Sequence, residues 1–185
     1  MVRSYAGQLL VSRPDMVDPN FDGTITFLLE HGSDGAVGVM LNRPSSLPVA
    51  DPFPGWVDLS SPPAMVFQGG PVQTNAIIAL GRHRRDAPPA ADFELPDGLV
   101  SVDLDEQPTL LAGAGLLEIR IFAGYAGWAA GQLEGEIATG AWWVVPGFAD
   151  DVFYPDPDTL WRHVMGRSGK EFRWFANLPS DPSVN

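Results

Sequence analysis

Apolar residues fall into short segments separated by glycine- and proline-rich turns, a pattern typical of a chain with many short strands. The clearest pair of predicted strands covers residues 24–30 and 36–42, on either side of a turn at residues 31–35. With Glu30 placed opposite Ala36, the large apolar side chains of the two strands share one face. We therefore expect a hairpin that packs this face against the core.

Other segments predict strands and helices along the rest of the chain. The further predicted strands cover residues 9–12, 64–68, 76–80, 99–104, 119–123 and 141–145. Helices are predicted at residues 108–117, 132–138 and 156–167, with one helical turn around Trp56. We expect an exposed loop at residues 86–97 and an acidic turn at residues 150–157. This mixture indicates an α+β fold.

The segment from residue 120 to residue 146 combines most of a strand, a bend, a helix and a returning strand. Gly124 and Gly127 follow the predicted strand at residues 119–123, and glycine tolerates backbone angles that other residues avoid. The predicted helix at residues 132–138 comes next. We expect this segment to form the main structural joint of the fold.

The helix predicted within this segment has two distinct faces. Gln132 and Glu136 are four residues apart and share one face, while Leu133 and Ile137 share another. If the helix extends back to Trp128, its indole joins the polar row. Two interpretations stay open: a site for a polar ligand, or a helix that packs on the sheet with a satisfied amide and an exposed carboxylate.

Length, net charge and cysteine content limit the kinds of protein that this chain can be. The chain has 185 residues, 45% of them hydrophobic, which fits one domain spanning residues 1–185, with a core at about 8–169 and a tail at 170–185. A net charge of −12 argues against a general nucleic-acid surface. The absence of cysteine excludes disulfides and zinc–thiolate sites. We expect a cytoplasmic protein, because neither a signal peptide nor a membrane-spanning run of about eighteen apolar residues is visible.

Several motifs occur in an order that resembles the bacterial AlgH/YqgE family. The resemblance covers nearly the whole chain, from Gln8 to about Gly169. Its motifs are S-R-P-D-M-V-D-P-N-F-D-G-T-I-T-F-L-L-E-H, G-A-V-G-V-M-L-N-R-P, Q-G-G-P-V, R-I-F-A-G-Y-A-G-W-A-A-G-Q-L-E-G-E-I-A-T-G-A-W, D-D-V-F and L-W. The family usually has Gly-Pro where this chain has Ala129-Ala130, so we expect a less rigid bend before the helix.

The resemblance implies a fold more than an activity. It implies an α+β protein whose bent, partly bifurcated and mostly antiparallel sheet forms a pseudo-barrel with flanking helices. It brings no established biochemical activity. The family name refers to a proposed role in transcriptional regulation, and a family label is not a mechanism.

Two further places offer groups that could bind a ligand. Arg43, next to Asn42 at a strand end, has a planar fork of donors that suits an anion. The alternative is that Asn42 bonds local backbone and Arg43 pairs with Glu30 or Glu136. Gly70 offers a backbone N–H group to a ligand, or serves only as a strand exit. The candidate ligand- or partner-binding residues are thus Asn42, Arg43, Gly70, Trp128, Gln132 and Glu136.

Catalytic and nucleotide motifs are missing. The sequence has no H-E-x-x-H zinc motif, no P-loop and no G-x-S-x-G elbow, so we expect no metal and no cofactor. An enzyme of unknown reaction would use Glu30, His31 or Glu136 as its acid/base group and needs these residues to converge with Arg43. Adjacent residues in a strand point to opposite faces, so Glu30 and His31 cooperate only if His31 has left the strand.

The sequence therefore favours a non-enzymatic binding or regulatory domain. Its partner would be a small molecule or a protein that the sequence does not identify. The sequence also indicates no oligomeric state. The basic run at residues 82–85 is short, and no helix-turn-helix pattern is visible. We expect no direct contact with nucleic acid and none with a membrane.

Overall fold

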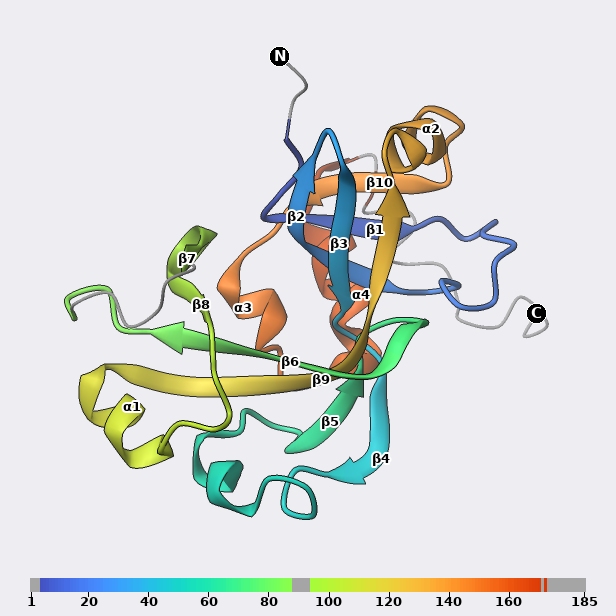
Figure 1. Cartoon of the computed structure of the whole chain (residues 1–185). Coiled ribbons are helices and arrows are strands. Elements are labelled where there is room, and N and C mark those ends of the chain that lie inside the picture. Colours follow the sequence, from blue (N-terminus) through green and yellow to red (C-terminus); the bar gives the residue numbers. More distant parts are fainter. Residues whose placement is uncertain (1–3, 88–93, 171, 173–185) are drawn as a thin grey trace.

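The computed structural model describes residues 4–87, 94–170 and 172, and its strands form one mixed, mostly antiparallel sheet flanked by helices (Figure 1). The strands are β1 (Gln8–Ser12), β2 (Ile25–Gly32), β3 (Gly35–Met40), β4 (Pro44–Pro48), β5 (Met65–Gln68), β6 (Val72–His83), β7 (Glu94–Leu95), β8 (Leu99–Ser101), β9 (Leu116–Ala129) and β10 (Trp142–Pro146). The helical elements are η1 (Pro54–Leu59), η2 (Pro96–Gly98), α1 (Pro108–Ala114), α2 (Gln132–Ala138), α3 (Ala149–Val152) and α4 (Pro157–Arg167). The α+β class is confirmed.

The sheet is open. Its strand order is β10-β1-β2-β3-β9-β6-β8-β7, and β4 and β5 form a branch in which β5 runs parallel to β9. Within the described residues, β10 and β7 lie at opposite ends of this order and do not pair. The sheet is therefore not closed into a barrel, which corrects the expected pseudo-barrel.

Strand β9 joins the two parts of the sheet through a bend. Its first part pairs with β6 as far as Tyr125, and its last four residues, from Ala126, pair with β3. Gly124 lies just before this change of partner, where the register with β6 shifts, with φ +73°, and a Cβ there would lie 2.6 Å from the carbonyl oxygen of Gly70. Figure 1 shows β9 turning at this point toward α2. The predicted bend is thus confirmed, although it occurs inside one continuous strand.

The β2–β3 hairpin has a different register from the predicted one. Phe27 lies opposite Val39 as expected, but a β-bulge interrupts the pairing after Leu28. The bulge places Glu30 opposite Val37 and His31 opposite Ala36, and the strands continue to Gly32 and Gly35. The predicted five-residue turn was therefore too long. The bulge takes up one extra residue of β2, and the pairing then continues past Glu30 into the residues that were predicted to form the turn. His31 lies in a strand.

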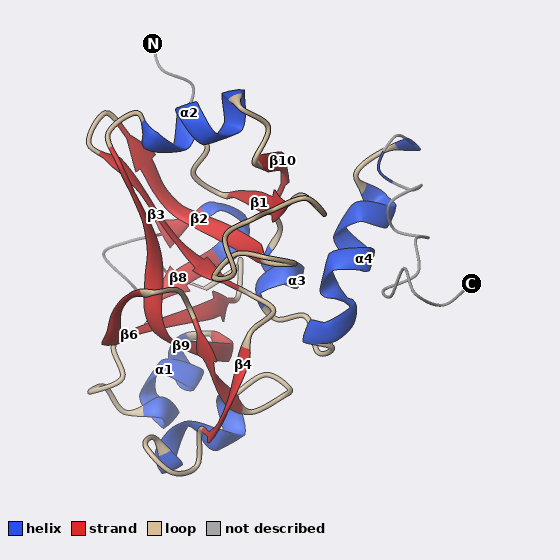
Figure 2. Ribbon diagram, turned by 90° about the vertical axis from the view of Figure 1, so that its right-hand side faces the viewer, coloured by secondary structure: helices blue, strands red, loops and turns tan. Residues whose placement is uncertain are grey.

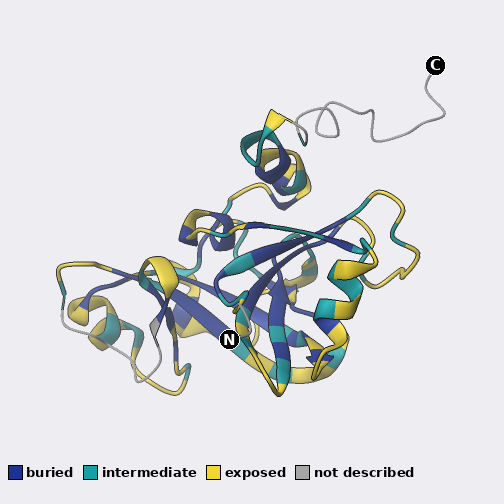
Figure 3. Cartoon of the chain, turned by 90° about the horizontal axis from the view of Figure 1, so that it is seen from above, coloured by how far each residue is buried: buried dark blue, intermediate teal, exposed yellow. Residues whose placement is uncertain are grey.

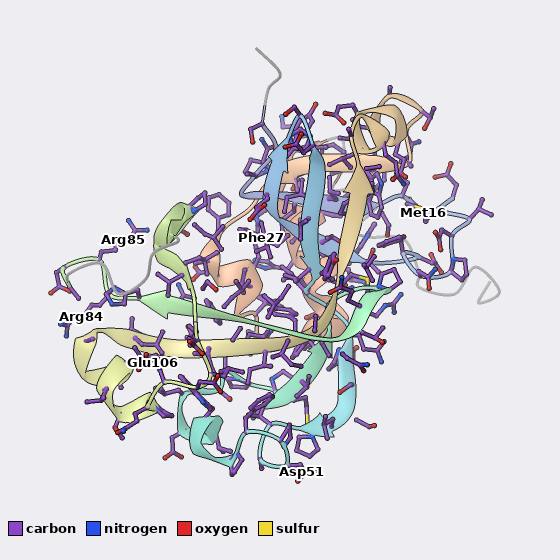
Figure 4. The ribbon with its side chains drawn as sticks, viewed as in Figure 1. Met16, Phe27, Asp51, Arg84, Arg85 and Glu106 are labelled. Atoms are coloured by element: carbon purple, nitrogen blue, oxygen red, sulfur yellow. The ribbon has the colours of Figure 1, made fainter. Side chains whose placement is uncertain are left out.

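Both faces of this hairpin are buried. Phe27 and Val39 pack in one core cluster with Leu160 and Val164 of α4, which lies along one side of the sheet (Figure 2). On the other face, Leu28 packs in a second cluster with Leu133 of α2. Figure 3 shows the buried residues concentrated on the central strands, and Figure 4 shows Phe27 within the interior. The helix α2 thus covers the face that the sequence left mixed.

A third core cluster lies where β9 and β6 meet η1 and α1, and it contains Trp56 of the predicted helical turn. The helix α1 ends earlier than predicted, because Gly115 has φ +120° and β9 already begins at Leu116. Part of the predicted acidic turn at 150–157 forms the helix α3. Residues 88–93 of the expected loop, and most of the expected tail at 170–185, lie outside the described residues.

In the described part of the chain, no helix combines the length and the apolar character needed to cross a bilayer.

Candidate functional site

The polar row predicted on α2 forms a closed hydrogen-bond network. Trp128 Nε1 donates to Glu136 Oε2 at 2.9 Å, and Gln132 Nε2 donates to Glu136 Oε1 at 2.9 Å. Trp142 Nε1, from β10, donates to the same Oε2 atom at 2.8 Å. The backbone N–H of Ala129 donates to Gln132 Oε1 at 3.0 Å. The carboxylate of Glu136 therefore joins α2 to both β9 and β10.

The indole rings in this network are covered by an aromatic contact. Phe21 lies 6.1 Å from Trp128 and 5.4 Å from Trp142 between ring centroids. Trp128 is 6% exposed and Trp142 is 4% exposed. The polar groups of Trp128, Gln132 and Glu136 are thus engaged with one another, and the geometry matches that of a structural clamp.

A groove of about 670 Å³ opens at the other end of β3. Its walls come from segments that are distant in the sequence: the loop before β2, the segment after β3, the exit of β5 and the start of β6. The side chains that face it include Asn20, Arg43, Gln68 and Thr74. Sequence reasoning found only Arg43 among these four, because no local pattern marks residues that meet only in the folded chain.

Asn42 and Arg43 use their side chains differently. Asn42 Oδ1 accepts from the backbone N–H of Ile25 at 2.9 Å, and its Nδ2 donates to the carbonyl of Gly23 at 2.8 Å. Asn42 therefore fastens the start of β2, as the alternative interpretation expected. Arg43 Nη2 donates to the backbone carbonyl of Asp22 and the side chain lines the groove.

Gly70 also lines the groove, and it lies against the backbone of β9. A Cβ at Gly70 would lie 2.1 Å from the carbonyl carbon of Tyr125. Its neighbour Gly69 donates its N–H to the carbonyl of Ala123 at 2.8 Å and accepts from the N–H of Met40 at 2.8 Å. The glycine pair thus lets the exit of β5 fit between β3 and the bend of β9.

The structure places five of the six candidate residues in two separate places, and the sixth, Asn42, fastens the start of β2 beside the groove without lining it. Arg43 and Gly70 share the groove, whereas Trp128, Gln132 and Glu136 lie in the network on α2. Trp128 pairs with Ala36 at the start of β3, and Arg43 follows the end of that strand. Along β3 alone, the four steps from Ala36 to Met40 span roughly 13 Å. Figure 1 shows α2 at one end of β3 and the connection to β4 at the other.

The side chain of His31 lies between α2 and the segment before β1. Its side chain is 1% exposed, and its Nε2 lies 3.1 Å from Glu134 Oε1 of α2. The backbone N–H of Tyr5 donates to His31 Nδ1 at 3.2 Å. A second pocket, of about 400 Å³, is lined by Glu30, His31 and Trp128 but not by Arg43. The described residues therefore do not form the cluster of acid/base groups with Arg43 that an enzyme was expected to need.

The basic run at residues 82–85 is paired with carboxylates. Arg82 lies 2.7 Å from Glu118 and 2.8 Å from Asp150, Arg84 lies 2.9 Å from Asp86, and Arg85 pairs with Asp97. Figure 4 shows Arg84 and Arg85 at the far end of β6. Because each of these charges has an acidic partner, the run does not form an uncompensated basic patch.

Arg120 is a buried cation inside the joint. Its Nη1 donates to the carbonyl of Tyr154 at 3.0 Å, its Nη2 donates to the carbonyl of Pro62, and the guanidinium lies 4.3 Å from the ring centroid of Phe67. Desolvation by burial lowers the pKa of Arg120 to about 10. The group stays charged at neutral pH and ties β9 to two loops.

No group of three or more His, Cys, Asp or Glu side chains within the described residues is arranged to hold a metal ion.

Comparison with known proteins identifies relatives across the whole chain. The family model described as AlgH-like matches residues 9–173. A UPF0301 protein from Streptomyces avermitilis is 44% identical over 188 residues, covering 100% of this chain and 97% of that protein. A UPF0301 protein from Thermobifida fusca is 45% identical over 193 residues, covering 98% of this chain and 96% of that protein.

Solved structures show the same fold. The crystal structure of a protein from Corynebacterium diphtheriae matches with a TM-score of 0.86 at 29% identity, covering 94% of this chain and 92% of that one. The solution structure of the AlgH protein from Pseudomonas aeruginosa matches with a TM-score of 0.69 at 31% identity, covering 98% and 97%. The chain belongs to the AlgH-like family.

Proposed function

We propose that this chain is a non-enzymatic binding domain of the cytoplasm, whose ligand docks in the groove at the end of β3. The groove carries this proposal, because it has the volume of a small-molecule site and gathers polar side chains from four separate segments. Arg43 and Gly70 of the predicted site line it. The network of Trp128, Gln132 and Glu136 has the role of holding α2 in place.

The regulatory part of the proposal follows from the family and from the charge. The family name refers to a proposed role in transcriptional regulation, and the net charge of −12 opposes binding to a phosphate backbone. The pairing of Arg82, Arg84 and Arg85 with carboxylates further opposes it. We infer that any effect on transcription passes through a bound ligand or a protein partner, without direct contact with DNA.

A ligand screen with a blocked groove tests the site. Thr74 lines the groove and is exposed, so Thr74→Trp fills the space without disturbing the core. We expect metabolites that raise the melting temperature of the original chain to lose this effect in Thr74→Trp. Val17→Trp, on a residue that is 93% exposed outside the groove, is the matched control and should keep it.

Three results, two from the ligand screen and one from a gel-shift experiment, would oppose the proposal. Compounds that stabilise the original chain and Thr74→Trp equally would place the ligand elsewhere. Loss of binding in Gln132→Ala, with Thr74→Trp unaffected, would move the site to α2. A gel-shift experiment at low salt that detects DNA binding would contradict the indirect mode of regulation.

The alternative, an enzyme that uses Glu30, His31 or Glu136, has weaker support. Glu136 accepts hydrogen bonds from two indoles and an amide, and the second pocket that includes Glu30 and His31 lacks Arg43.

A further inference from the structure

We propose that the groove recognises an anionic group of its ligand, a carboxylate or a phosphate, through the guanidinium of Arg43. This inference rests on the proposed function, which makes the groove the ligand site. It adds the chemical class of the ligand and the residue that selects it.

Arg43 differs in its charge balance from the described arginines that form ion pairs. It differs from Arg120, which also donates to backbone carbonyls, because Arg120 is buried and Arg43 lines the groove. Arg13, Arg82, Arg84 and Arg167 each lie within salt-bridge distance of a carboxylate. Within residues 4–87, 94–170 and 172, Arg43 has no such partner. In a chain with 23 acidic residues and 11 basic ones, a guanidinium without a carboxylate partner beside a groove is a local positive site.

The hydrogen bonds of Arg43 leave its charge available. A guanidinium has five N–H donors in one plane. In the described part of the chain, only Nη2 has an acceptor, which is the neutral backbone carbonyl of Asp22. This bond orients the side chain without neutralising it. The remaining donors suit a carboxylate or phosphate, which accept two parallel hydrogen bonds from arginine.

The rest of the groove fits such a ligand. Among the described residues, no aspartate or glutamate lines it, so an incoming anion meets no carboxylate from these residues there. Asn20, Gln68 and Thr74 add amide and hydroxyl groups that can donate to anionic oxygens or bind the polar body of the ligand. Met40 and Pro71 provide apolar contact. The groove thus combines one fixed cation with neutral polar groups.

The test is a titration followed by 1H–15N NMR spectra, with inorganic pyrophosphate, citrate and uncharged trimethyl citrate as probes. We expect pyrophosphate or citrate to give saturable shifts of the backbone amides of Gln68, Gly70 and Thr74, and trimethyl citrate to give none. The pyrophosphate and citrate arms distinguish a phosphate ligand from a carboxylate ligand. Unchanged spectra elsewhere show that each variant is folded.

Two variants of Arg43 separate the effect of its positive charge from the effect of its planar guanidinium. Arg43→Gln should weaken binding by about tenfold or more, and Arg43→Lys should weaken it less, because lysine keeps the charge but loses the planar fork. Arg13→Gln removes a guanidinium paired with Asp15 and should change nothing. Anion shifts that persist in Arg43→Gln, or that appear at Arg84 and Arg85 instead, would overturn the inference.

The titration also separates this inference from the proposed function. If neutral metabolites shift the groove amides while both anions leave them unchanged, the groove remains the site and the anionic class is wrong. If no compound from the metabolite screen shifts these amides and binding maps to another surface, the proposed function fails as well.

Discussion

Phe21 stacks on Trp128, with ring centroids 6.1 Å apart and ring planes 28° from parallel. The next residue along the chain, Asp22, accepts the hydrogen bond of Arg43 at the groove, and Asn20 lines that groove. One short loop therefore contacts both the groove and the aromatic residues beneath α2. This loop connects two places that lie at opposite ends of β3.

Phe21→Ala should remove the aromatic cover of the two indoles. Because Phe21 is only partly buried, we expect a loss of about 2 kcal/mol in unfolding free energy, roughly half the cost of a fully buried Phe→Ala change. Tryptophan emission should shift to longer wavelength. Urea unfolding followed by fluorescence measures both effects. Val17→Ala, on an exposed residue of the preceding segment, should change neither, and equal effects of the two variants would contradict the packing role.

Anion binding at Arg43 should be visible in the same indoles. An anion on the remaining donors of the guanidinium changes the charge beside the backbone carbonyl of Asp22, so the loop that carries Phe21 is expected to shift. Citrate or pyrophosphate should then change tryptophan emission in the original chain, and Trp128→Phe should remove most of that change. Binding without any change in emission would show that the loop does not transmit the event.

Glu136→Gln should destabilise the fold although the side chain keeps its shape. The carboxylate accepts from two indoles and one amide, whereas a glutamine presents an N–H₂ group to at least one of these donors. We expect a loss of about 2 kcal/mol, measured by urea unfolding. Glu106→Gln, on an exposed residue, is the control. A stability equal to that of the original chain would show that Glu136 is not the centre of the clamp.

Gly124→Ala should distort the joint between the two parts of the sheet. The residue has φ +73°, and its Cβ would lie 2.6 Å from the carbonyl oxygen of Gly70, so we expect a loss of about 2 kcal/mol or more. Gly113→Ala is the matched control, because this glycine lies in α1 with nothing within 4 Å of its Cβ. The control should stabilise the protein by about 0.5–1 kcal/mol. Thermal unfolding of the two variants measures both shifts.

Arg120→Lys should weaken the contact between β9 and its neighbouring loops. A lysine keeps the charge but does not span the carbonyls of Tyr154 and Pro62 as the guanidinium does, so we expect a loss of about 2 kcal/mol. Arg84→Lys, at an exposed ion pair, should cost less than about 1 kcal/mol. Equal stabilities of the two variants would contradict the proposed role of Arg120.

Much of the fold could be predicted from local pattern. The hairpin around Phe27 and Val39, the bend at Gly124, and the apolar face of α2 at Leu133 follow from alternation, glycine positions and helical spacing. The bulge after Leu28 could not be predicted, because an extra residue leaves no mark in an apolar segment. Strand β6 extends over exposed polar residues, which the prediction of a strand at 76–80 missed.

The candidate site was less predictable than the fold. The spacing of Gln132 and Glu136 identified a polar face, but the second indole, from Trp142, comes from another strand and completes the network. Arg43 could be singled out by its chemistry. The absence of a carboxylate partner for Arg43 within the described residues, and the approach of Gln68 and Thr74, depend on tertiary contacts between distant segments.

The bend in β9 also has a consequence for the order in which the protein folds. Strands β3, β5 and β6 are all synthesised before β9, and each pairs with it. Until residues 116–129 have left the ribosome, each of these strands has an edge without its final partner, and unpaired edges are prone to aggregation. Formation of the long-range pairings of β9 is therefore expected to limit the folding rate, and fragments that end before Leu116 should be insoluble rather than smaller versions of the domain.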